Sequence, residues 1–375
     1  MIAKKIYLDN NATTQLDPWV AAVLAEDLKS PPSNPSSMHS FGRDAKLKLL
    51  KARTFIAGIF NVKPHEVIFT SSGTESMNLL LRGLIDPSSS PHILSSNVEH
   101  SCVQKTLLDL EAKGCKVTFL PADLKGAVSL EELKNAITPD VKFLVFSSAS
   151  SETGVKHDLK AFSALALEIN IPLIVDGVAT LGKEPFSFYP GILGAGFSAH
   201  KFHGPKGIGF VLMRSHTTFR LSPLITGGGQ EFDLRSGTEN LGGILGLEEA
   251  LKQVQKSSHD MQILRDRFEQ KILKHLSFVQ VNGSGPRICN VSNLCFPGVD
   301  AETLLIQLDL HGVAASQGSA CSSGALEPSR ILLAMGLSQN LARSSLRFSL
   351  SRFTTEEEID ATVELLAALV PKLKD

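Results

Sequence analysis

The sequence predicts an α/β protein with a mostly parallel sheet and a smaller α+β unit towards the C-terminus. Between residues 93 and 175, short apolar strands alternate with helical stretches, which is typical of parallel sheets whose strands are joined by helices. The chain has 375 residues and exceeds a typical single domain, so we expect a large and a small domain. Ligands of such sheets bind beyond the carboxyl ends of the strands.

The composition is that of an ordinary globular protein, with 43% hydrophobic and 20% charged residues. The net charge of −1 gives no reason to expect nucleic acid or a membrane as a partner. Met1–Asp9 lacks the pattern of a signal peptide and no apolar run is long enough to span a bilayer, so we expect a cytoplasmic protein. The five cysteines, in no metal-ligand spacing, indicate free thiols and no metal site.

The N-terminal part of the chain has the pattern of a strand and turn, two helices and a second strand. The proline-rich and polar segment Ser30–Ser37 indicates a loop between the helices. The expected elements are a strand at Ile6–Asp9, a turn at Asn10–Thr14, helices at Pro18–Leu28 and Gly42–Phe60, and a strand at Glu66–Thr70.

The alternating part of the chain forms the rest of the expected sheet. Its strands are Ile93–Ser95, Lys116–Leu120, Phe143–Ser147 and Pro172–Val175, and its helices are Met77–Leu84, Val103–Lys113, Leu130–Ile137 and Ala161–Ile169. Four polar residues follow predicted strands and are expected at the carboxyl edge of the sheet: His100, Ser151, Asp176 and Lys201.

Lys201 lies in Phe197–Gly209, where small and polar residues precede a Gly/Pro turn and an apolar run from Ile208 to Met213. This pattern predicts a catalytic amine at a strand-to-turn corner. An amine in a partly enclosed site can deprotonate and condense with an aldehyde, and pyridoxal 5′-phosphate is the usual aldehyde. A surface lysine beside a turn is the alternative, and the remaining candidates favour the cofactor.

The segment Ser71–Ser76 joins a predicted strand to a helix through small residues. The free N–H groups of such a turn and the helix dipole both favour an anion, so the segment is a candidate phosphate site. A plain helix cap by Ser72 or Thr74 is equally compatible with the pattern. The Gly-Lys-Ser/Thr ending of a nucleotide-binding loop is missing, so we do not expect an ATP site.

Asp176 and His100 could contact the ring of the same cofactor. A carboxylate at the end of a buried strand can keep a pyridine nitrogen protonated, which makes the ring an electron sink. An imidazole can stack on a flat ring. A helix-capping aspartate and a structural histidine are the alternatives, and only the joint occurrence with Lys201 favours the cofactor site.

Beyond this region, the glycines of Gly227–Glu231 allow close backbone approach, and Arg235 and Thr238 could contact an anion. A flexible loop is the alternative. A long helix from Ile244 to about Leu276 is expected to end the large domain.

The C-terminal unit combines strands, helices and two residues with chemical potential. Arg347 alternates with apolar residues, which indicates a bidentate partner such as a substrate carboxylate, and a structural salt bridge is the alternative. Cys321 lies among Gly, Ser and Ala residues that cannot bury it, so we expect an exposed thiol, whereas Cys289 and Cys295 lie in apolar strands and should be inert. The expected elements are strands at Arg287–Cys295 and Gly312–Ala315, a helix at Ala301–Leu310 and a helix from about Thr355.

In these motifs the sequence resembles the NifS/IscS-type cysteine desulfurases, fold-type I pyridoxal-phosphate enzymes of the class V aminotransferase group. The Gly-Ser-Ala-Cys loop followed by Glu327-Pro328-Ser329 resembles the long-loop group. The motifs occur in family order at Tyr7–Thr14, Asn34–His39, Ser72–Asn78, Glu99-His100, Ser198–Gly209, Gly227–Asn240, Gly318–Ser329 and Arg347–Thr354.

The resemblance implies a role for each candidate. Lys201 would form a Schiff base with pyridoxal 5′-phosphate, Asp176 would pair with the ring nitrogen, and His100 would stack on the ring and act as acid or base. The large domain would comprise residues 15–255 and bind the cofactor, and the small domain, residues 1–14 and 256–375, would carry the cysteine loop. The implied phosphate ligands are Gly73, Thr74, Ser198 and His200, joined by Thr238 from the other subunit of a homodimer.

The implied reaction converts L-cysteine to L-alanine. Asn34 and Arg347 would hold the substrate carboxylate, and Cys321 would be the nucleophile that accepts sulfur as a persulfide. The sulfur would serve iron–sulfur cluster or other sulfur-cofactor assembly through an acceptor or scaffold protein.

Three departures from the family pattern stand out. Ser151 replaces an asparagine that reaches cofactor and substrate, Ala179 replaces a glutamine that binds the cofactor, and Ser351 replaces a glycine. The alternatives are a selenocysteine lyase or another class V transaminase or lyase, against which the Cys321 loop argues, and a weakly active cofactor-binding scaffold, against which Lys201 and Arg347 argue.

Overall fold

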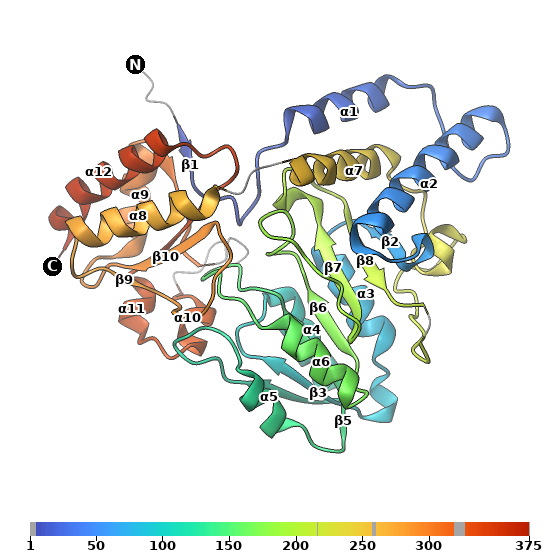
Figure 1. Ribbon diagram of the computed structural model, residues 1–375, viewed down its shortest axis with the longest axis horizontal. Coiled ribbons are helices and arrows are strands. Elements are labelled where there is room, and N and C mark those ends of the chain that lie inside the picture. Colours follow the sequence, from blue (N-terminus) through green and yellow to red (C-terminus); the bar gives the residue numbers. More distant parts are fainter. Residues whose placement is uncertain (1–4, 216, 257–259, 319–326, 375) are drawn as a thin grey trace.

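The computed structural model describes residues 5–215, 217–256, 260–318 and 327–374. Its largest element is a seven-stranded sheet with the strand order β2-β8-β7-β6-β5-β3-β4 (Figure 1). Every pairing in this sheet is parallel except the two that β8 makes. The strands are β2 (Val67–Thr70), β3 (His92–Ser96), β4 (Lys116–Leu120), β5 (Val141–Ser147), β6 (Leu173–Asp176), β7 (Ile192–Ser198) and β8 (Gly209–Met213).

Helices cover both faces of this sheet. Side chains of α2, α6 and α7 pack against one face, and side chains of α3 and α4 pack against the other. Successive residues of a strand face opposite sides of the sheet, so in β8 Phe210 and Leu212 belong to one core and Val211 to the other. The helices are α1 (Pro18–Lys29), α2 (Ser40–Phe60), α3 (Gly73–Leu84), α4 (Ser101–Ala112), α5 (Leu130–Ala136), α6 (Leu159–Glu168) and α7 (Leu241–Lys256).

A second hydrophobic core lies beside the large sheet. It is built on an antiparallel sheet of order β12-β10-β9 and a parallel pair of β1 with β11. Ile6 and Leu8, from the start of the chain, pack into this C-terminal core. The elements are β1 (Ile6–Tyr7), α8 (Met261–His275), β9 (Gln280–Val281), β10 (Val291–Cys295), α9 (Ala301–Leu310), β11 (Val313–Ala314), α10 (Arg330–Ala334), α11 (Gln339–Arg343), β12 (Ser345–Ser349) and α12 (Glu356–Leu373).

The fold confirms the predicted α/β class, with two differences in the elements. The long helix expected from Ile244 to Leu276 is two helices, because Ile244 on α7 belongs to the sheet core whereas Phe268 on α8 belongs to the C-terminal core. The strand expected from Arg287 begins only at Val291. The domain boundaries at residues 14/15 and 255/256 remain a prediction.

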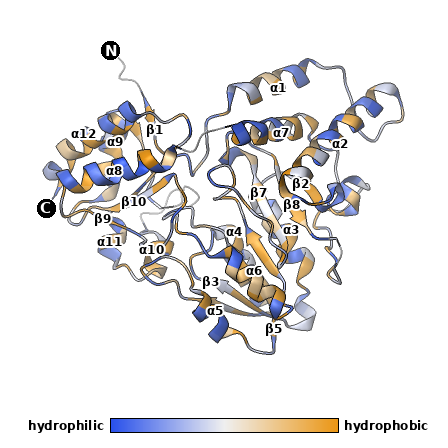
Figure 2. Ribbon diagram, viewed as in Figure 1, coloured by the Kyte–Doolittle hydropathy of each residue, from blue (hydrophilic) through white to orange (hydrophobic). Residues whose placement is uncertain are grey.

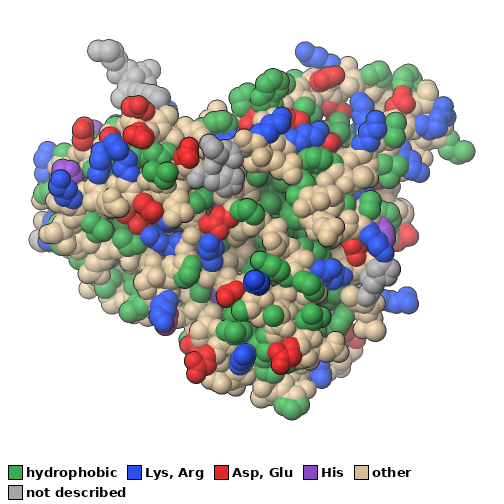
Figure 3. Space-filling model, in the orientation of Figure 1, with side chains coloured by type: hydrophobic (Ala, Val, Ile, Leu, Met, Phe, Trp, Pro, Cys, Tyr) green, Lys and Arg blue, Asp and Glu red, His purple; other side chains and the backbone are tan. Residues whose placement is uncertain are grey.

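The distribution of polarity follows this architecture. Figure 2 shows that the hydrophobic residues gather on the strands of the sheet and on the inward sides of the helices. Figure 3 shows basic and acidic side chains interspersed over the visible face, as expected for a net charge of −1. Across the described residues, no helix has both the length and the apolar composition that crossing a membrane requires.

A buried ion pair fixes the glycine-rich segment that follows β8. Arg53 on α2 forms two hydrogen bonds of 2.6 and 2.7 Å with the carboxylate of Glu231, which also accepts one from the backbone of Phe69. Glu231 and the two residues after it have positive φ angles of 48, 61 and 64°, a conformation that costs non-glycine residues energy. The ion pair therefore holds a strained turn of the segment that carries Thr238.

We expect Arg53→Leu to lower the free energy of unfolding by about 3–5 kcal/mol, because the carboxylate of Glu231 would remain buried without a partner. The matched control is Arg267→Leu, which breaks the half-exposed pair with Asp360 and should cost less than about 1 kcal/mol. Urea unfolding measures both. Combining Arg53→Leu with Glu231→Leu should cost less than the sum of the single changes, and simple additivity would contradict this account.

Candidate active site

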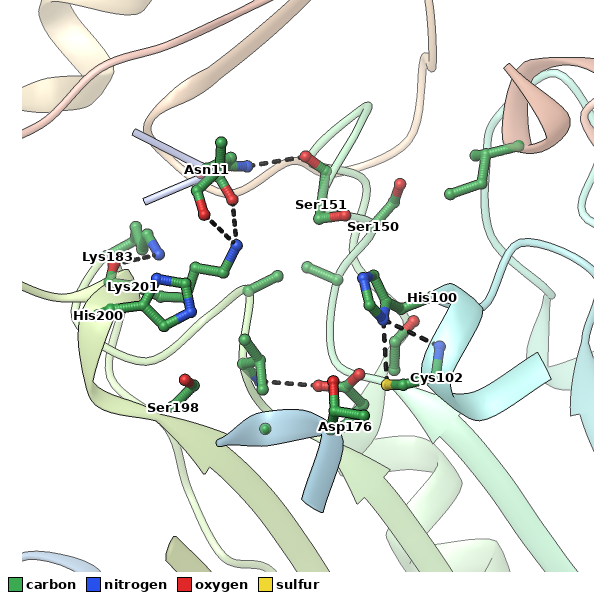
Figure 4. A pocket seen from close by; sticks show the side chains of 18 of the residues that line it. Asn11, His100, Cys102, Ser150, Ser151, Asp176, Lys183, Ser198, His200 and Lys201 are labelled. Atoms are coloured by element: carbon green, nitrogen blue, oxygen red, sulfur yellow. Dashed lines mark hydrogen bonds between the residues drawn. The ribbon is translucent and has the colours of Figure 1, made fainter. Parts of the chain in front are cut away.

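A pocket lies at the carboxyl edge of the large sheet, where β5, β6 and β7 end (Figure 4). The amino ends of α3 and α4 reach it from the same edge, and residues 11–12 and Arg347 close it on the side of the C-terminal core. The predicted site residues that line it are Gly73, Thr74, His100, Ser151, Asp176, Ser198, His200, Lys201 and Arg347.

Lys201 enters the pocket from the short 3-10 helix Ala199–Lys201, which directly follows β7. Its ammonium group donates hydrogen bonds of 2.5 and 2.8 Å to the backbone carbonyls of Asn11 and Ala12. These carbonyls orient the amine towards the interior of the pocket, across from His100 (Figure 4).

Lys183 is a second amine in the pocket that the sequence analysis did not single out. It is 4% exposed and donates a 2.7 Å hydrogen bond to the carbonyl oxygen of Lys201. Burial, and secondarily the charge of Lys201, lowers the pKa of Lys183 to about 7. Lys183 can therefore take up or release a proton near neutral pH beside the candidate Schiff-base lysine.

Asp176 is the last residue of β6 and is 6% exposed. Its carboxylate accepts a 3.0 Å hydrogen bond from the backbone of Val178, and among the described residues it forms no salt bridge. Burial raises the pKa of Asp176, and the nearby His100 opposes this shift. A protonated pyridine nitrogen would give this buried carboxylate a cationic partner, so Asp176 fits the predicted role.

His100 begins α4 as the residue that caps its amino end. Its Nδ1 accepts a 3.2 Å hydrogen bond from the backbone N–H of Cys102 and lies 3.0 Å from the sulfur of that residue. The cap orients the imidazole before any ligand is bound, because Nδ1 must face the helix. In a neutral ring held in this way, the proton is on Nε2.

The end of the pocket near α3 has the features of an anion site. The hydroxyl of Ser198 is buried and has no hydrogen-bond partner within the described part of the chain. A side chain at Gly73 would come within 2.7 Å of Val178, so glycine lets the helix start approach closely. A phosphate at this helix start could accept hydrogen bonds from the backbone and from Ser198, so the residues fit the phosphate of pyridoxal 5′-phosphate.

His200 stands at the same end of the pocket and is hydrogen-bonded through Nδ1 to the hydroxyl of Thr13, at 3.1 Å. Burial lowers the pKa of His200 to about 4, and the neighbouring Lys201 adds to the shift. The imidazole is therefore neutral at physiological pH in the ligand-free pocket.

Arg347 combines the two roles that its sequence pattern left open. It is 1% exposed, and it donates one hydrogen bond of 2.7 Å to the carboxylate of Asp9 and one of 3.1 Å to the carbonyl oxygen of Ser151. Its Nε is buried and has no partner among the described residues. Arg347 thus forms a structural ion pair and also lines the pocket, while its predicted contact with a substrate carboxylate remains a prediction.

Two of the predicted residues that the structure describes, Asn34 and Thr238, do not line this pocket. Asn34 is exposed and its side chain accepts a hydrogen bond from the backbone of Ser36, and its predicted contact with the substrate remains a prediction. Thr238 is also exposed and does not line the pocket, which leaves the expected contact with a partner subunit as a prediction. Cys321 lies outside the described residues.

Several polar residues that line the pocket were not predicted as site residues, among them Asn11, Cys102 and Lys183. Each lies close in sequence to a feature that was recognised. Asn11 belongs to the polar turn after the first strand, Cys102 follows His100 by two positions, and Lys183 follows Asp176 in the loop after β6.

Three features meet at one edge of the seven-stranded sheet: a lysine at a strand end, a buried carboxylate beside an imidazole, and a candidate anion site at a helix start. Together with the fold, they define a fold-type I pyridoxal-phosphate enzyme. The family profile described as "Aminotransferase class-V" matches residues 6–362. The chain therefore belongs to the class V aminotransferase family, whose members depend on pyridoxal 5′-phosphate.

Comparison with known proteins places the chain near enzymes named as desulfurases. It is 39% identical to Cysteine desulfurase 2 of Trichormus variabilis, with 98% of this chain and 94% of the relative covered. It is 38% identical to Cysteine desulfurase IscS of Dictyoglomus turgidum, with 99% and 96% covered. A solved NifS-like protein superposes with a TM-score of 0.90 at 32% identity and covers 99% of this chain and 100% of its own. These findings confirm the predicted resemblance and fold class.

Glu99 provides a pH-dependent test of the site's packing. It is fully buried beside His100, and its carboxylate accepts hydrogen bonds from the hydroxyl of Ser96 and the backbone of Ser147, at 2.6 and 3.1 Å. Burial raises the pKa of Glu99 from 4.5 to about 7. Because the folded pKa lies above the unfolded one, the protonated form stabilises the fold below pH 4.5 and this stability is lost as the pH rises to 7.

We expect Glu99→Gln to remove this loss, since an amide cannot ionise. Between pH 4.5 and 7 the wild-type chain should lose on the order of 3 kcal/mol of unfolding free energy relative to the variant. Urea unfolding of both proteins at several pH values gives the difference. Parallel stability curves across this range would show that Glu99 does not titrate as the geometry indicates.

Proposed function

We propose that this protein is a pyridoxal 5′-phosphate-dependent cysteine desulfurase that converts L-cysteine to L-alanine and places the sulfur on Cys321 as a persulfide. The observation that carries the proposal is the convergence of Lys201, Asp176 and His100 on one pocket that Arg347 also lines. The names and near-complete coverage of the relatives support the same activity.

The residues of the pocket divide into a phosphate end and a ring region. Ser198, His200 and the amino end of α3 would hold the phosphate, Lys201 would hold the aldehyde carbon, and Asp176 would pair with the ring nitrogen. When bound, the cofactor supplies an electron sink that makes the α-proton of an amino acid removable. His100 is fixed by its helix cap and would cover one face of the ring.

The amines are arranged for proton transfer at the substrate. Lys183 has a pKa of about 7 and contacts the backbone of Lys201, so a change in the charge of Lys183 alters the electrostatic field at the Lys201 ammonium group.

Arg347 would bind the substrate carboxylate through its unpartnered Nε, while Asp9 keeps its hydrogen bond to another nitrogen of the guanidinium group.

The sulfur step uses the thiol of Cys321. The C–S bond of the substrate breaks, an S–S bond forms, and the β-carbon gains hydrogen and becomes the methyl group of alanine. The substrate sulfur loses two electrons and the β-carbon gains them, so no external oxidant is needed. Described residues on both sides of the cysteine segment are held near the pocket, because Ser316 pairs with the backbone of Arg347 and Ser329 bonds to Glu152.

The assembly and the sulfur acceptor are part of the proposal. We propose a homodimer in which the exposed Thr238 contacts the phosphate in the partner subunit, and a protein acceptor that takes the persulfide sulfur for iron–sulfur cluster or related assembly. The proposed nucleophile is a free thiol, and thiols stay reduced in the cytoplasm, so we propose that the protein acts there.

We expect the cofactor-loaded protein to release alanine from L-cysteine, with one equivalent of sulfide when a thiol reductant is present. Lys201→Ala should abolish alanine formation because it removes the amine that would hold the aldehyde, and Lys183 is turned towards the backbone carbonyl of residue 201. Cys321→Ser should keep the visible spectrum of the cofactor but release no sulfide, since a hydroxyl cannot accept sulfur. Sulfide release by Cys321→Ser at the wild-type rate, or release of pyruvate in place of alanine, would favour another class V activity.

The departures at Ser151 and Ala179 lead to a further prediction. Both residues line the pocket, and the neighbouring Thr180 cannot easily replace the missing amide because its hydroxyl is 2.6 Å from that of Ser148. A hydrogen bond to the cofactor is worth about 0.5–1.5 kcal/mol. Ser151→Asn with Ala179→Gln should therefore shift the pH titration of the cofactor's visible band and raise the single-turnover rate.

A double-mutant cycle on these two positions separates their effects. If one contact steadies the ring for the other, the two substitutions should not be additive. An unchanged titration and an unchanged single-turnover rate in the double variant would show that another group already makes these contacts.

A further inference from the structure

The pocket contains a thiol that the proposed reaction does not use. Cys102 is the second residue of α4 and lines the pocket beside His100. Its sulfur lies 3.0 Å from Nδ1 of His100 (Figure 4). By contrast, Cys115, Cys289 and Cys295 are buried and do not line this pocket.

Cys102 is part of a set of three potential metal ligands. One nitrogen of His100, the sulfur of Cys102 and one carboxylate oxygen of Asp176 all lie within 4.8 Å of one another. In a tetrahedral zinc site the bond lengths place neighbouring N, O and S ligands about 3.4–3.6 Å apart. The three donors are thus close enough to share one ion after side-chain movement, and coordination by Nδ1 of His100 would replace its hydrogen bond from the backbone of Cys102.

The spacing of the cysteines in the sequence predicted no metal site. The fold supplies the missing ligand from a distant segment, since β6 delivers Asp176 to the same sheet edge at which α4 begins. Asp176 is more than nine-tenths buried and accepts one hydrogen bond, from Val178, among the described residues. Its second oxygen is thus available on the side of the pocket.

The charges of this set suit a divalent cation. A thiolate and a carboxylate together neutralise two positive charges, and the imidazole adds a neutral donor. Because the set includes a sulfur and a nitrogen donor, it is more suited to Zn²⁺ than to Mg²⁺ or Ca²⁺, which prefer oxygen ligands.

We propose that His100, Cys102 and Asp176 form a binding site for a thiophilic divalent cation such as Zn²⁺, and that this cation and the cofactor exclude each other from the pocket. The proposed cation site is argued from the spacing of the three donors and does not depend on the proposed function. Mutual exclusion rests on the proposed function, in which Asp176 pairs with the ring nitrogen and His100 covers the ring. The same carboxylate and imidazole cannot serve the ring and the cation together.

Titration with Co²⁺ tests the cation site in the full chain freed of cofactor. Cys321→Ser serves as the background, because it removes the other thiol predicted to be exposed. We expect a thiolate-to-cobalt absorption band that disappears in Cys102→Ala, with affinity weakened at least about tenfold. The matched control is Cys115→Ala, which removes a buried thiol outside the pocket and should leave the band unchanged.

A second variant guards against misfolding of the first. Asp176→Asn should keep the thiolate band but weaken Co²⁺ binding at least about tenfold, and circular dichroism checks that each variant is folded. Absence of the band in the Cys321→Ser background, or its persistence in Cys102→Ala, would overturn the proposed site.

Cofactor uptake tests the mutual exclusion. Saturating Zn²⁺ should slow the appearance of the cofactor's visible band at least about tenfold, a chelator should restore the uptake, and Cys102→Ala should be insensitive to Zn²⁺. Equal uptake with and without Zn²⁺ would refute the exclusion even if the cobalt band is present. If the chain took up no cofactor in the absence of metal, the proposed function would fail while the cobalt result still stood.

Discussion

The active site depends on a short N-terminal segment that is held from two sides. On one side, Ser349 of β12 donates a 2.7 Å backbone hydrogen bond to Leu8, and its hydroxyl accepts a 2.9 Å bond from the backbone of Asn11. On the other side, Lys201 donates to the carbonyls of Asn11 and Ala12. The candidate catalytic amine is therefore positioned by a peptide that the C-terminal core fixes, so the large sheet alone does not define the site.

This arrangement brings several charged side chains together in a largely buried pocket. Lys183, Lys201 and Arg347 approach the pocket together with the carboxylate of Asp176, and burial is the first cause of the pKa shifts of Lys183 and Asp176. Burial disfavours the charged form of each group, so the pocket favours ligands that bring the complementary charge. An anionic phosphate at one end and a cation at Asp176 would each meet this requirement.

Local sequence patterns predicted the strands of the sheet and the polar residues at their ends. Alternating apolar runs gave the strands of the sheet, and the rule that ligands gather at strand ends placed Asp176 and Lys201 correctly at one edge. Lys183 and Cys102 were missed because their place in the pocket depends on loop paths and helix position, which local patterns do not contain. Thr238 could not be tested in one chain, since its predicted contact requires a second.

Two of the departures from the family pattern lie in the pocket that would hold the ring. Ser151 and Ala179 line this pocket together with Asp176, His100 and Cys102, whereas the residues predicted to bind the phosphate, Gly73, Thr74, Ser198 and His200, match the family pattern. His100 belongs both to the pocket and to the start of α4, because one nitrogen caps the helix and the rest of the imidazole faces the pocket. Any ligand that draws Nδ1 away from the helix must compete with this cap. The position of Cys102 next to that nitrogen therefore couples the choice of ligand to the integrity of the helix start.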